Sequence, residues 1–400
     1  MKCFAAYAKD VEIRKLGSSG ALFPVLSMAH IRKGGIVYAS VYDEQLNVKF
    51  ARIENETHLQ ESFTSKYAQS KVGDTFRNLE ADLKEGRSVL FCGTPCQVAG
   101  LRRYLNKKRV NNDRLLLAEI LCHGVPSGDI FQKAMGRCHP GCTQLNMRSK
   151  DLGWDWGGFA WKLRFSDGSE QVIPQADVPY MKGFLGNIFL RPSCYQCAVK
   201  PSEAADLTLG DFWGICFVND RIPTRYGVSA VILRTPAAEV AFSEISEDIE
   251  TFEVRYEDIL AYNPRLETPV PKPIYRRRFF RKLCNNPDTD IQNLIDAACS
   301  PSIIRKVANR IYQKLPKGTT SVRDLTVNHE RVLYSVKEQC CGCEACYNVC
   351  PTHAISMKKD REGFFYSVID PSKCVNCGVC TSVCPFASEP NQHSDGNRHS

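Results

Sequence analysis

The residues with the clearest chemistry in this sequence are cysteines that follow the same spacing twice near the C-terminal end. Thiolates three residues apart can ligate three irons of one cubane 4Fe–4S cluster, and a fourth thiolate stopped by proline turns toward a second cluster. The sequence therefore predicts two iron–sulfur clusters. Both runs have the form C-x2-C-x2-C-x3-C-P, and they consist of Cys340, Cys343, Cys346, Cys350 and Pro351, and of Cys374, Cys377, Cys380, Cys384 and Pro385.

This spacing is the bacterial-type ferredoxin signature, in which the fourth cysteine of each run ligates the cluster of the other run. We therefore expect crossed ligation of two clusters, named cluster I and cluster II. A pair of zinc sites is the alternative, but zinc modules usually have isolated C-x2-C pairs separated by longer stretches. The expected ligands are Cys340, Cys343, Cys346 and Cys384 for cluster I, and Cys374, Cys377, Cys380 and Cys350 for cluster II.

Four further cysteines could hold a third cluster, named cluster III. Cys194 and Cys197 form a C-x2-C pair, while Cys96 and Cys122 each lie where an expected strand meets a turn. Functional loops concentrate at such strand ends in α/β folds. Zinc at the same four residues, or buried thiols acting as small hydrophobic side chains, are the alternatives. Cys341 has no counterpart in the second run, and we expect it to be a spare thiol.

A short run of small residues, Gly17-Ser18-Ser19-Gly20, precedes the helix-like stretch ALFPVLSMAHI. Small residues let backbone amides approach a phosphate, and a helix N-terminus favours negative charge there. A plain helix cap is the alternative. His123 directly follows Cys122, and it would either relay a proton or serve as a structural imidazole.

The composition is that of an ordinary globular protein, with 43% hydrophobic and 24% charged residues among 400. No window of about 18 apolar residues could span a bilayer, and the opening MKCFAAYAKDVEIRKLG lacks the features of a signal peptide. We therefore expect a cytoplasmic protein without a membrane span. Twenty cysteines in such a chain favour metal ligation over disulfides, and exposed clusters favour an anaerobic cell.

The net charge of +8 is concentrated in two basic stretches. One interpretation is a solvated helix face and a linker. The other is attraction for an acidic electron-transfer partner or a phosphorylated substrate. Nucleic acid is not expected as a partner, because no recognition motif accompanies the charge. The stretches contain Lys272, Arg276, Arg277, Arg278, Arg281 and Lys282, and then Arg305, Lys306, Arg310, Lys314, Lys317 and Arg323.

From Lys15 to about Thr235, strand-like and helix-like stretches alternate, which is typical of an α/β layer. A hairpin is expected in FAWKLRFSDGSEQVI, and two short strands in ISMKKDREGFFYSVID. Expected strands are IVYASVYD, Ser88–Cys92, LLLAEILC, Asp206–Gly210 and Val228–Arg234, and expected helices are TSKYAQSKVGDTFRNLEADLKEG, QVAGLRRYL and residues 237–249.

Several of these stretches together resemble the family of coenzyme F420 hydrogenase and dehydrogenase beta subunits. The resemblance covers roughly residues 10 to 235 and depends on motifs in a fixed order. It implies a flavoprotein that carries FAD beside a 4Fe–4S cluster, with Ser18, Ser19 and Gly20 as the flavin phosphate loop and Lys66 as a nearby contact. It also favours cluster III at Cys96, Cys122, Cys194 and Cys197. The matching stretches are GSSGALF, KGGIVYASVYD, SKYAQS-x-VGDT, VLFCGTPCQVAGL, ILCHGVPS, MRSKDLGW, FLRPSCYQC and DLTLGDFWG.

The chain departs from that family's pattern in two places. A fused ferredoxin module often lies at the N-terminus in the family, whereas here it lies at the C-terminus. The connector is long enough to bring the clusters to the same flavin face. Ala21 stands where a second glycine is common after the SSG sequence.

The expected fold class is an α/β flavoprotein domain, a mixed sheet with flanking helices, plus a small α+β ferredoxin-like dicluster domain. Residues 1–86 and 87–260 are expected to form the N-terminal and C-terminal parts of the flavin domain, the latter with cluster III. The expected remainder is a basic helical connector at 261–336, the dicluster domain at 337–390 and a disordered tail at 391–400.

Joining one-electron clusters to a two-electron substrate requires a converter, and a flavin supplies one. The first hypothesis is an oxidoreductase passing electrons between the clusters and FAD, to or from a small molecule such as coenzyme F420. The alternative is an electron-transfer subunit that feeds a separate catalytic protein. A redox partner protein or ferredoxin is expected in both cases. The C-x3-C-x2-C triplet of radical enzymes that use S-adenosylmethionine does not occur, and hydrolase chemistry finds no support.

Overall fold

The computed structural model describes residues 1–154, 158–286, 288–299, 311–312, 319–322, 325 and 331–387. Its largest element is an eight-stranded sheet with the strand order β11-β1-β10-β9-β5-β4-β2-β3. These strands are β1 (Lys2–Ala8), β2 (Ile36–Tyr42), β3 (Val48–Ile53), β4 (Val89–Gly93), β5 (Leu115–Ile120), β9 (Leu207–Asp211), β10 (Ser229–Leu233) and β11 (Ile249–Glu253).

The sheet is mixed, as predicted. Strands β2, β4, β5 and β9 are parallel to one another, whereas β3, β10, β1 and β11 join through antiparallel pairs. All residues of β4 are buried, and so are all but the last residue of β5. Such continuous apolar runs are typical of parallel strands covered on both faces.

Helices cover the two faces of this sheet. On one face, α2 (Leu22–Arg32) and α9 (Pro236–Ser243) pack over alternate side chains of the central strands. On the other face lie α4 (Thr75–Lys84) and α5 (Pro95–Lys108), whose apolar side chains share a core with β2 and β4. That core continues through Cys341, Cys343 and Ala345 into the C-terminal quarter of the chain.

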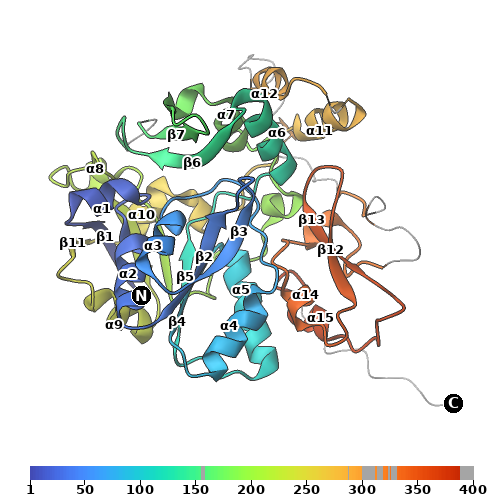
Figure 1. Cartoon of the computed structure of the whole chain (residues 1–400), viewed down its shortest axis with the longest axis horizontal. Coiled ribbons are helices and arrows are strands. Elements are labelled where there is room, and N and C mark those ends of the chain that lie inside the picture. Colours follow the sequence, from blue (N-terminus) through green and yellow to red (C-terminus); the bar gives the residue numbers. More distant parts are fainter. Residues whose placement is uncertain are drawn as a thin grey trace.

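A second layer lies beside the large sheet (Figure 1). It holds the three-stranded sheet β6 (Cys142–Ser149), β7 (Ala160–Phe165) and β8 (Glu170–Pro174), with α6 (Gly128–Cys138) and α7 (Pro179–Leu185). The pairing of Trp161 with Ile173 confirms the predicted hairpin. The hydrophobic core of this second layer also includes side chains of α11 (Arg276–Asn285) and α12 (Ile291–Cys299).

Helix α11 is more than a solvated connector. Phe279, Phe280 and Leu283 are buried in the second layer, and Arg276 is buried in an ion pair with Glu362. Only the outer face of the first basic stretch is exposed, at Arg277, Arg278, Arg281 and Lys282. The second basic stretch lies outside the described residues, as does the predicted tail at 391–400.

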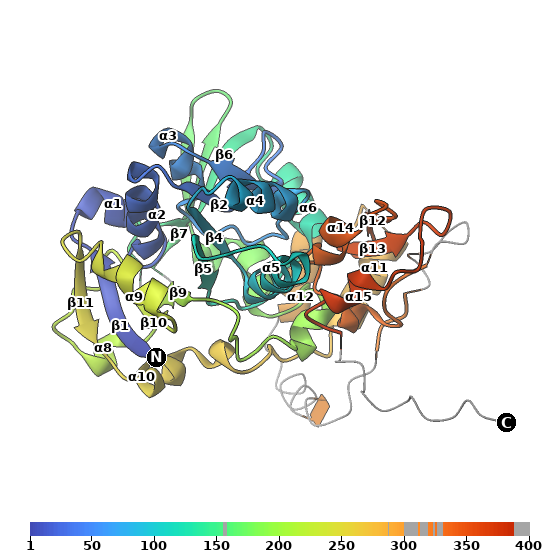
Figure 2. The ribbon, with the colours of Figure 1, turned by 90° about the horizontal axis from the view of Figure 1, so that it is seen from below.

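The C-terminal module is a small α+β unit, as predicted. It contains η5 (Lys337–Gln339), α14 (Ala345–Val349), β12 (Ile355–Lys359), β13 (Phe365–Ile369) and α15 (Val379–Ser382), and β12 pairs with β13 around the Gly363 turn. Both views show this module beside α5, at one end of the molecule (Figures 1 and 2).

Buried polar contacts fix the module on α4 and its preceding loop. The Glu344 carboxylate accepts hydrogen bonds from the amides of Val72 and Gly73, at 3.1 and 2.9 Å. Arg77 donates to the carbonyls of Tyr347 and Asn348. The ferredoxin-like module is therefore packed against the large domain.

The structure differs from expectation in several elements. The helix expected from TSKYAQSKVGDTFRNLEADLKEG is shorter, because only Thr75–Lys84 is helical. Strands β1, β3, β6 and β11 were not anticipated. The remaining helices are α1 (Val11–Leu16), α3 (Glu56–Leu59), η1 (Gln60–Ser62), η2 (Gln175–Asp177), η3 (Pro192–Gln196), α8 (Ile215–Val218), α10 (Tyr256–Tyr262) and η4 (Pro264–Leu266). Within the described residues, no helix is both long enough and apolar enough to cross a membrane.

Candidate functional site

A cavity of about 540 Å³ opens at the carboxyl ends of the parallel strands. Its walls include Ser40 of β2, Gly93 of β4, Cys122 after β5 and Asp211 at the end of β9. Ligands of open α/β sheets bind outside the carboxyl ends of the strands. The volume lies within the range of small-molecule and cofactor sites. We name this space the flavin cavity, after the cofactor that the family resemblance implies.

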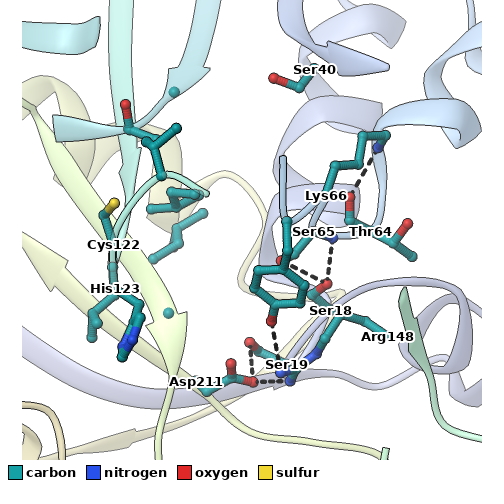
Figure 3. Close-up of a pocket in the computed structure, with 18 of the residues that line it drawn as sticks. Ser18, Ser19, Ser40, Thr64, Ser65, Lys66, Cys122, His123, Arg148 and Asp211 are labelled. Carbon is teal, nitrogen blue, oxygen red and sulfur yellow. Dashed lines mark hydrogen bonds and ion pairs between the residues drawn. The ribbon is translucent and has the colours of Figure 1, made fainter. Parts of the chain in front are cut away.

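The predicted phosphate loop forms one side of the flavin cavity (Figure 3). The Ser18 hydroxyl accepts a hydrogen bond from the Ser65 amide at 2.9 Å, and the Ser19 hydroxyl donates to Asp211 at 2.7 Å. Both serines line the cavity, but Gly20 lies behind them, where a Cβ would come within 2.3 Å of the Ala6 carbonyl oxygen. Gly20 therefore permits close packing of the loop on β1.

Backbone geometry shows why glycine suits the position that Ala21 occupies here. Ala21 has a φ of 64°, in the left-handed region, immediately before α2 begins at Leu22. Glycine adopts this region at no steric cost, whereas alanine does not. The N-terminal turn of α2 contributes Leu22 and Phe23 to the cavity wall, so its amides lie near a potential anion site.

Lys66 is the cation on this side of the flavin cavity. Its Nζ donates to the Thr64 carbonyl at 3.0 Å and lies 5.4 Å from the centre of the Tyr42 ring. Burial lowers the pKa of Lys66 to about 7. A bound anion would favour the charged amine and raise that pKa.

Asp211 holds this side together, although we did not predict it as a site residue. It accepts hydrogen bonds from Ser19, from Arg148 at 2.6 Å and from the Trp154 indole at 2.8 Å. Lys150 donates to the Ser19 carbonyl at 2.6 Å. The signal was present, because these residues lie in the motifs MRSKDLGW and DLTLGDFWG.

The opposite side of the flavin cavity contains Cys122 and His123 (Figure 3). The His123 Nε2 lies 2.7 Å from the Asn187 Oδ1. Burial lowers the pKa of His123 to about 4, so the imidazole is neutral at pH 7. The His123 side chain lines the flavin cavity, and its ring forms a hydrogen bond with Asn187 there.

The four cysteines proposed for cluster III line one small cavity of about 30 Å³ behind that wall. Cys96 lies at the start of α5, Cys122 follows β5, and Cys194 and Cys197 lie at η3. Thus three distant segments bring these thiols together. Burial raises the pKa of Cys194 to about 12, whereas a hydrogen bond with Cys341 lowers the pKa of Cys96 to about 7.

The four cysteines proposed for cluster I line another cavity, of about 230 Å³. They come from both runs, which is the arrangement that crossed ligation requires. Cys340 and Cys343 are buried, whereas the proposed cluster II set contains Cys377, which is exposed. The cavity is lined by Cys340, Cys343, Cys346 and Cys384 among its residues. Within the described residues, no group of three or more His, Cys, Asp or Glu side chains is arranged to hold a single metal ion.

Cys341, expected to be a spare thiol, connects these spaces. It lines the cluster I cavity, the cluster III cavity and the flavin cavity. Gly342 is shared by the cluster I cavity and the flavin cavity, and Cys96 and Cys122 are shared by the cluster III and flavin cavities. The three spaces are therefore contiguous.

The donor sets fit the groups that the sequence implies. Four thiols around one cavity match the four-thiolate requirement of a 4Fe–4S cluster. The flavin cavity combines apolar walls with a lysine, small-residue loop and helix N-terminus on one side. Such a combination suits a ligand with an aromatic ring system and a diphosphate.

Two family profiles match this sequence. The profile for the C-terminal part of the coenzyme F420 hydrogenase/dehydrogenase beta subunit matches residues 86–257. The profile for the 4Fe–4S dicluster domain matches residues 339–388. The first covers the segment with the proposed cluster III cysteines, and the second covers both cysteine runs.

Individual relatives match the dicluster segment. An uncharacterized ferredoxin of Methanocaldococcus jannaschii is 41% identical over 49 residues, which are 12% of this chain and 62% of the ferredoxin. An uncharacterized polyferredoxin-like protein of the same organism is 40% identical over 67 residues, which are 15% of this chain and 40% of that protein. The chain thus spans less than two thirds of the length of these two curated relatives.

A solved structure, the xenon-derivatized F420-reducing NiFe hydrogenase complex from Methanosarcina barkeri, contains a chain with a TM-score of 0.46 and 15% identity. The alignment covers 71% of this chain and 92% of that chain.

Proposed function

Because residues 86–257 match the C-terminal domain of the coenzyme F420 hydrogenase/dehydrogenase beta subunit and residues 339–388 match the 4Fe–4S dicluster domain, we propose that this chain is an iron–sulfur flavoprotein oxidoreductase. It passes electrons between ferredoxin-type 4Fe–4S clusters and FAD, to or from a small molecule such as coenzyme F420. One observation supports this proposal most strongly: the proposed cluster I, cluster III and flavin spaces are contiguous, and Cys341 lines all three.

The proposed cofactor residues divide between two sides of the flavin cavity. Ser18, Ser19 and Lys66 would hold the FAD diphosphate, with Asp211 and Lys150 fixing the loop from behind. FAD, when bound, supplies the exchange between single electrons and a hydride. Tyr67, Phe184 and Trp213 line the cavity, and their rings would exclude water from the bound ring system.

The proposed cluster ligands are the twelve cysteines predicted from the sequence. Cys96, Cys122, Cys194 and Cys197 hold cluster III at the wall of the flavin cavity, where all four line one small space. The dicluster module holds clusters I and II, and its contacts through Glu344 and Arg77 fix cluster I toward the large domain.

Anaerobic purification with iron, sulfide and flavin measured together tests the proposal. We expect about twelve irons and about one FAD per chain. About eight irons without flavin would reduce the protein to a ferredoxin carrier and overturn the proposed function.

Replacing one proposed ligand tests cluster III separately. Cys194→Ser should lower the iron content by about four and remove one cluster signal from the EPR spectrum, while the other two signals remain. Cys216→Ser is the matched control, because Cys216 is exposed and lies on α8 away from the cavity. An unchanged iron content in Cys194→Ser would refute the assignment.

The second candidate function is an electron-transfer subunit that feeds a separate catalytic protein. Exposed residues at the proposed cluster II favour contact with another protein, since Cys377 is exposed and Val375 is 64% exposed. The isolated chain distinguishes the two candidates. Reoxidation of reduced flavin by coenzyme F420 without any partner would exclude the second, whereas reoxidation only after a partner is added would exclude the first.

A further inference from the structure

Arg191 extends from the large domain into the ferredoxin-like module. It immediately precedes η3, which contains the proposed cluster III ligand Cys194. Its guanidinium donates from Nε to the Cys340 carbonyl at 2.8 Å and from Nη2 to the Phe365 carbonyl at 2.8 Å. The same Nη2 lies 3.4 Å from the Cys340 Sγ. This side chain thus contacts a proposed ligand of cluster I.

The surroundings of Arg191 are shaped for the guanidinium. The residue is 0% exposed, and the guanidinium lies 4.1 Å from the centre of the Tyr366 ring. Gly342 has a φ of +72°, and a Cβ there would come within 2.8 Å of the Arg191 Nη1. Both the glycine and the ring fix the cation at one position beside Cys340.

No carboxylate forms an ion pair with this buried guanidinium within the described residues, although the buried Glu344 carboxylate is close enough to interact with its charge. Two other buried arginines do have such partners: Arg148 pairs with Asp211 at 2.6 Å, and Arg276 pairs with Glu362 at 2.5 Å. The described hydrogen-bond acceptors of Arg191 are two carbonyls, the Gln69 amide oxygen and the Cys340 sulfur. A buried cation without a directly paired anion is costly, so an anionic group bound beside Arg191 would stabilise it.

A 4Fe–4S cluster with four thiolate ligands is an anion, and reduction adds one further negative charge. We propose that Arg191 is a positioning residue that serves as the buried counter-charge of cluster I and raises its reduction potential above that of cluster II. The inference rests on the proposed function, because it requires cluster I to be present. Its physical basis is that a cation and a hydrogen bond at the ligand sulfur favour the more negative, reduced state.

Cluster II lacks such a partner in the described part of the chain. The sulfur of Cys350 accepts from the Ala354 amide at 3.3 Å, and Cys374 contacts Asn376. These partners are neutral, and Cys377 is open to solvent. The ordering of reduction potentials therefore favours transfer of one electron from cluster II to cluster I. In this step cluster II becomes oxidised and cluster I becomes reduced, and no atom moves between them.

Potentiometric EPR titration of the anaerobically purified protein tests this inference. In Arg191→Gln, the reduced-to-oxidised ratio of cluster I at a fixed potential should fall about tenfold, which for a one-electron couple is about 59 mV. The cluster II signal should titrate as before. Arg191→Lys keeps the charge but loses the planar donor group, so its cluster I potential should lie between those of the wild type and Arg191→Gln.

Arg103→Gln is the matched control. Arg103 also contacts a proposed cluster I ligand, donating to the Cys384 carbonyl at 2.8 Å, but it is exposed. Solvent screens such a charge, so its removal should leave the potential nearly unchanged. An equal shift in Arg103→Gln, or an unshifted cluster I in both Arg191 variants, would overturn the inference.

Iron and sulfide contents separate the possible failures. If the wild type contains no dicluster, the proposed function fails. If clusters are present but the Arg191 variants do not shift the higher-potential signal, only the role of Arg191 fails. If Arg191→Gln loses its clusters, the role of Arg191 is tested by the reduction potential of cluster I in Arg191→Lys.

Discussion

At the scale of single residues, Lys66 determines how pH acts on the flavin cavity. Burial lowers its pKa to about 7 in the cavity, and a bound diphosphate would raise that pKa. Binding then takes up a proton above pH 7, so the affinity for FAD should fall as pH rises. We expect a loss of about tenfold between pH 6 and pH 8.5, measurable by quenching of FAD fluorescence on titration with apoprotein.

Two variants isolate this effect. Lys66→Arg keeps a charge that does not titrate in this range, so FAD affinity should become independent of pH between 6 and 8.5. Lys66→Met should bind FAD more weakly than the wild type at pH 6. Its affinity for FAD should likewise be independent of pH. A pH dependence that persists in both variants would exclude Lys66 as its source.

Some site residues could be predicted from sequence and others could not, for a physical reason. The cysteine runs show a ligand pattern locally, because ligands of one cluster lie three residues apart. Asp211 and Arg191 lie in motifs of the family resemblance, but no ligand spacing marks their roles, since each acts on a segment distant in the chain. Arg191 contacts Cys340 only because the two domains pack together. The flavin-loop residues and cluster ligands stay predictions.

At the scale of elements, the close packing of α5 on α14 places the ferredoxin-like module. Gly100 on α5 makes this approach possible, because a Cβ there would come within 2.9 Å of the Cys343 Sγ and 3.4 Å of the Ala345 Cβ. Gly100→Ala should therefore lower the free energy of unfolding by about 1–3 kcal/mol, as measured by chemical denaturation under anaerobic conditions. The cluster I EPR signal should also change.

Gly136 provides the matched comparison for this helix substitution. It lies in α6, and a Cβ there would meet no atom within 4 Å. Gly136→Ala should raise the free energy of unfolding by about 0.5–1 kcal/mol, because alanine favours the helix. Stabilisation of the protein by Gly100→Ala as well would contradict the proposed contact.

The elements differ in how far sequence could predict them. The buried parallel strands β4 and β5 were predicted because their apolar runs are unbroken. The helix expected across residues 64–86 begins eleven residues later, since its first part forms the loop that holds Ser65 and Lys66 against the flavin cavity. Strand β1 was missed because its small apolar residues have no alternation, and its pairing with β10 and β11 is long-range.

At the scale of the whole molecule, the proposed clusters differ in the exposure of their ligands, and cluster II contains the most exposed one. Cys377 of the proposed cluster II is exposed, whereas Cys340 and Cys343 of cluster I are 9% and 6% exposed. A chelator should therefore remove about four irons in a first phase, with cluster II signals disappearing before the others. The order in which the clusters are lost can be measured by following iron release and the EPR spectrum together.

A ligand variant checks which cluster gives the first phase. Cys377→Ser should lack the fast release and keep the slower phases. Loss of cluster I or cluster III before cluster II in the wild type would contradict the prediction that the exposed Cys377 makes cluster II the most labile.

The position of Cys341 and Gly342 also has a consequence for biogenesis. These two residues complete the wall of the flavin cavity, yet they belong to the last quarter of the chain and leave the ribosome after every other part of that wall. Chains fold from the N-terminus during synthesis. The nascent large domain therefore presents an open-sided cavity, and closure of that side coincides with the docking of the ferredoxin-like module.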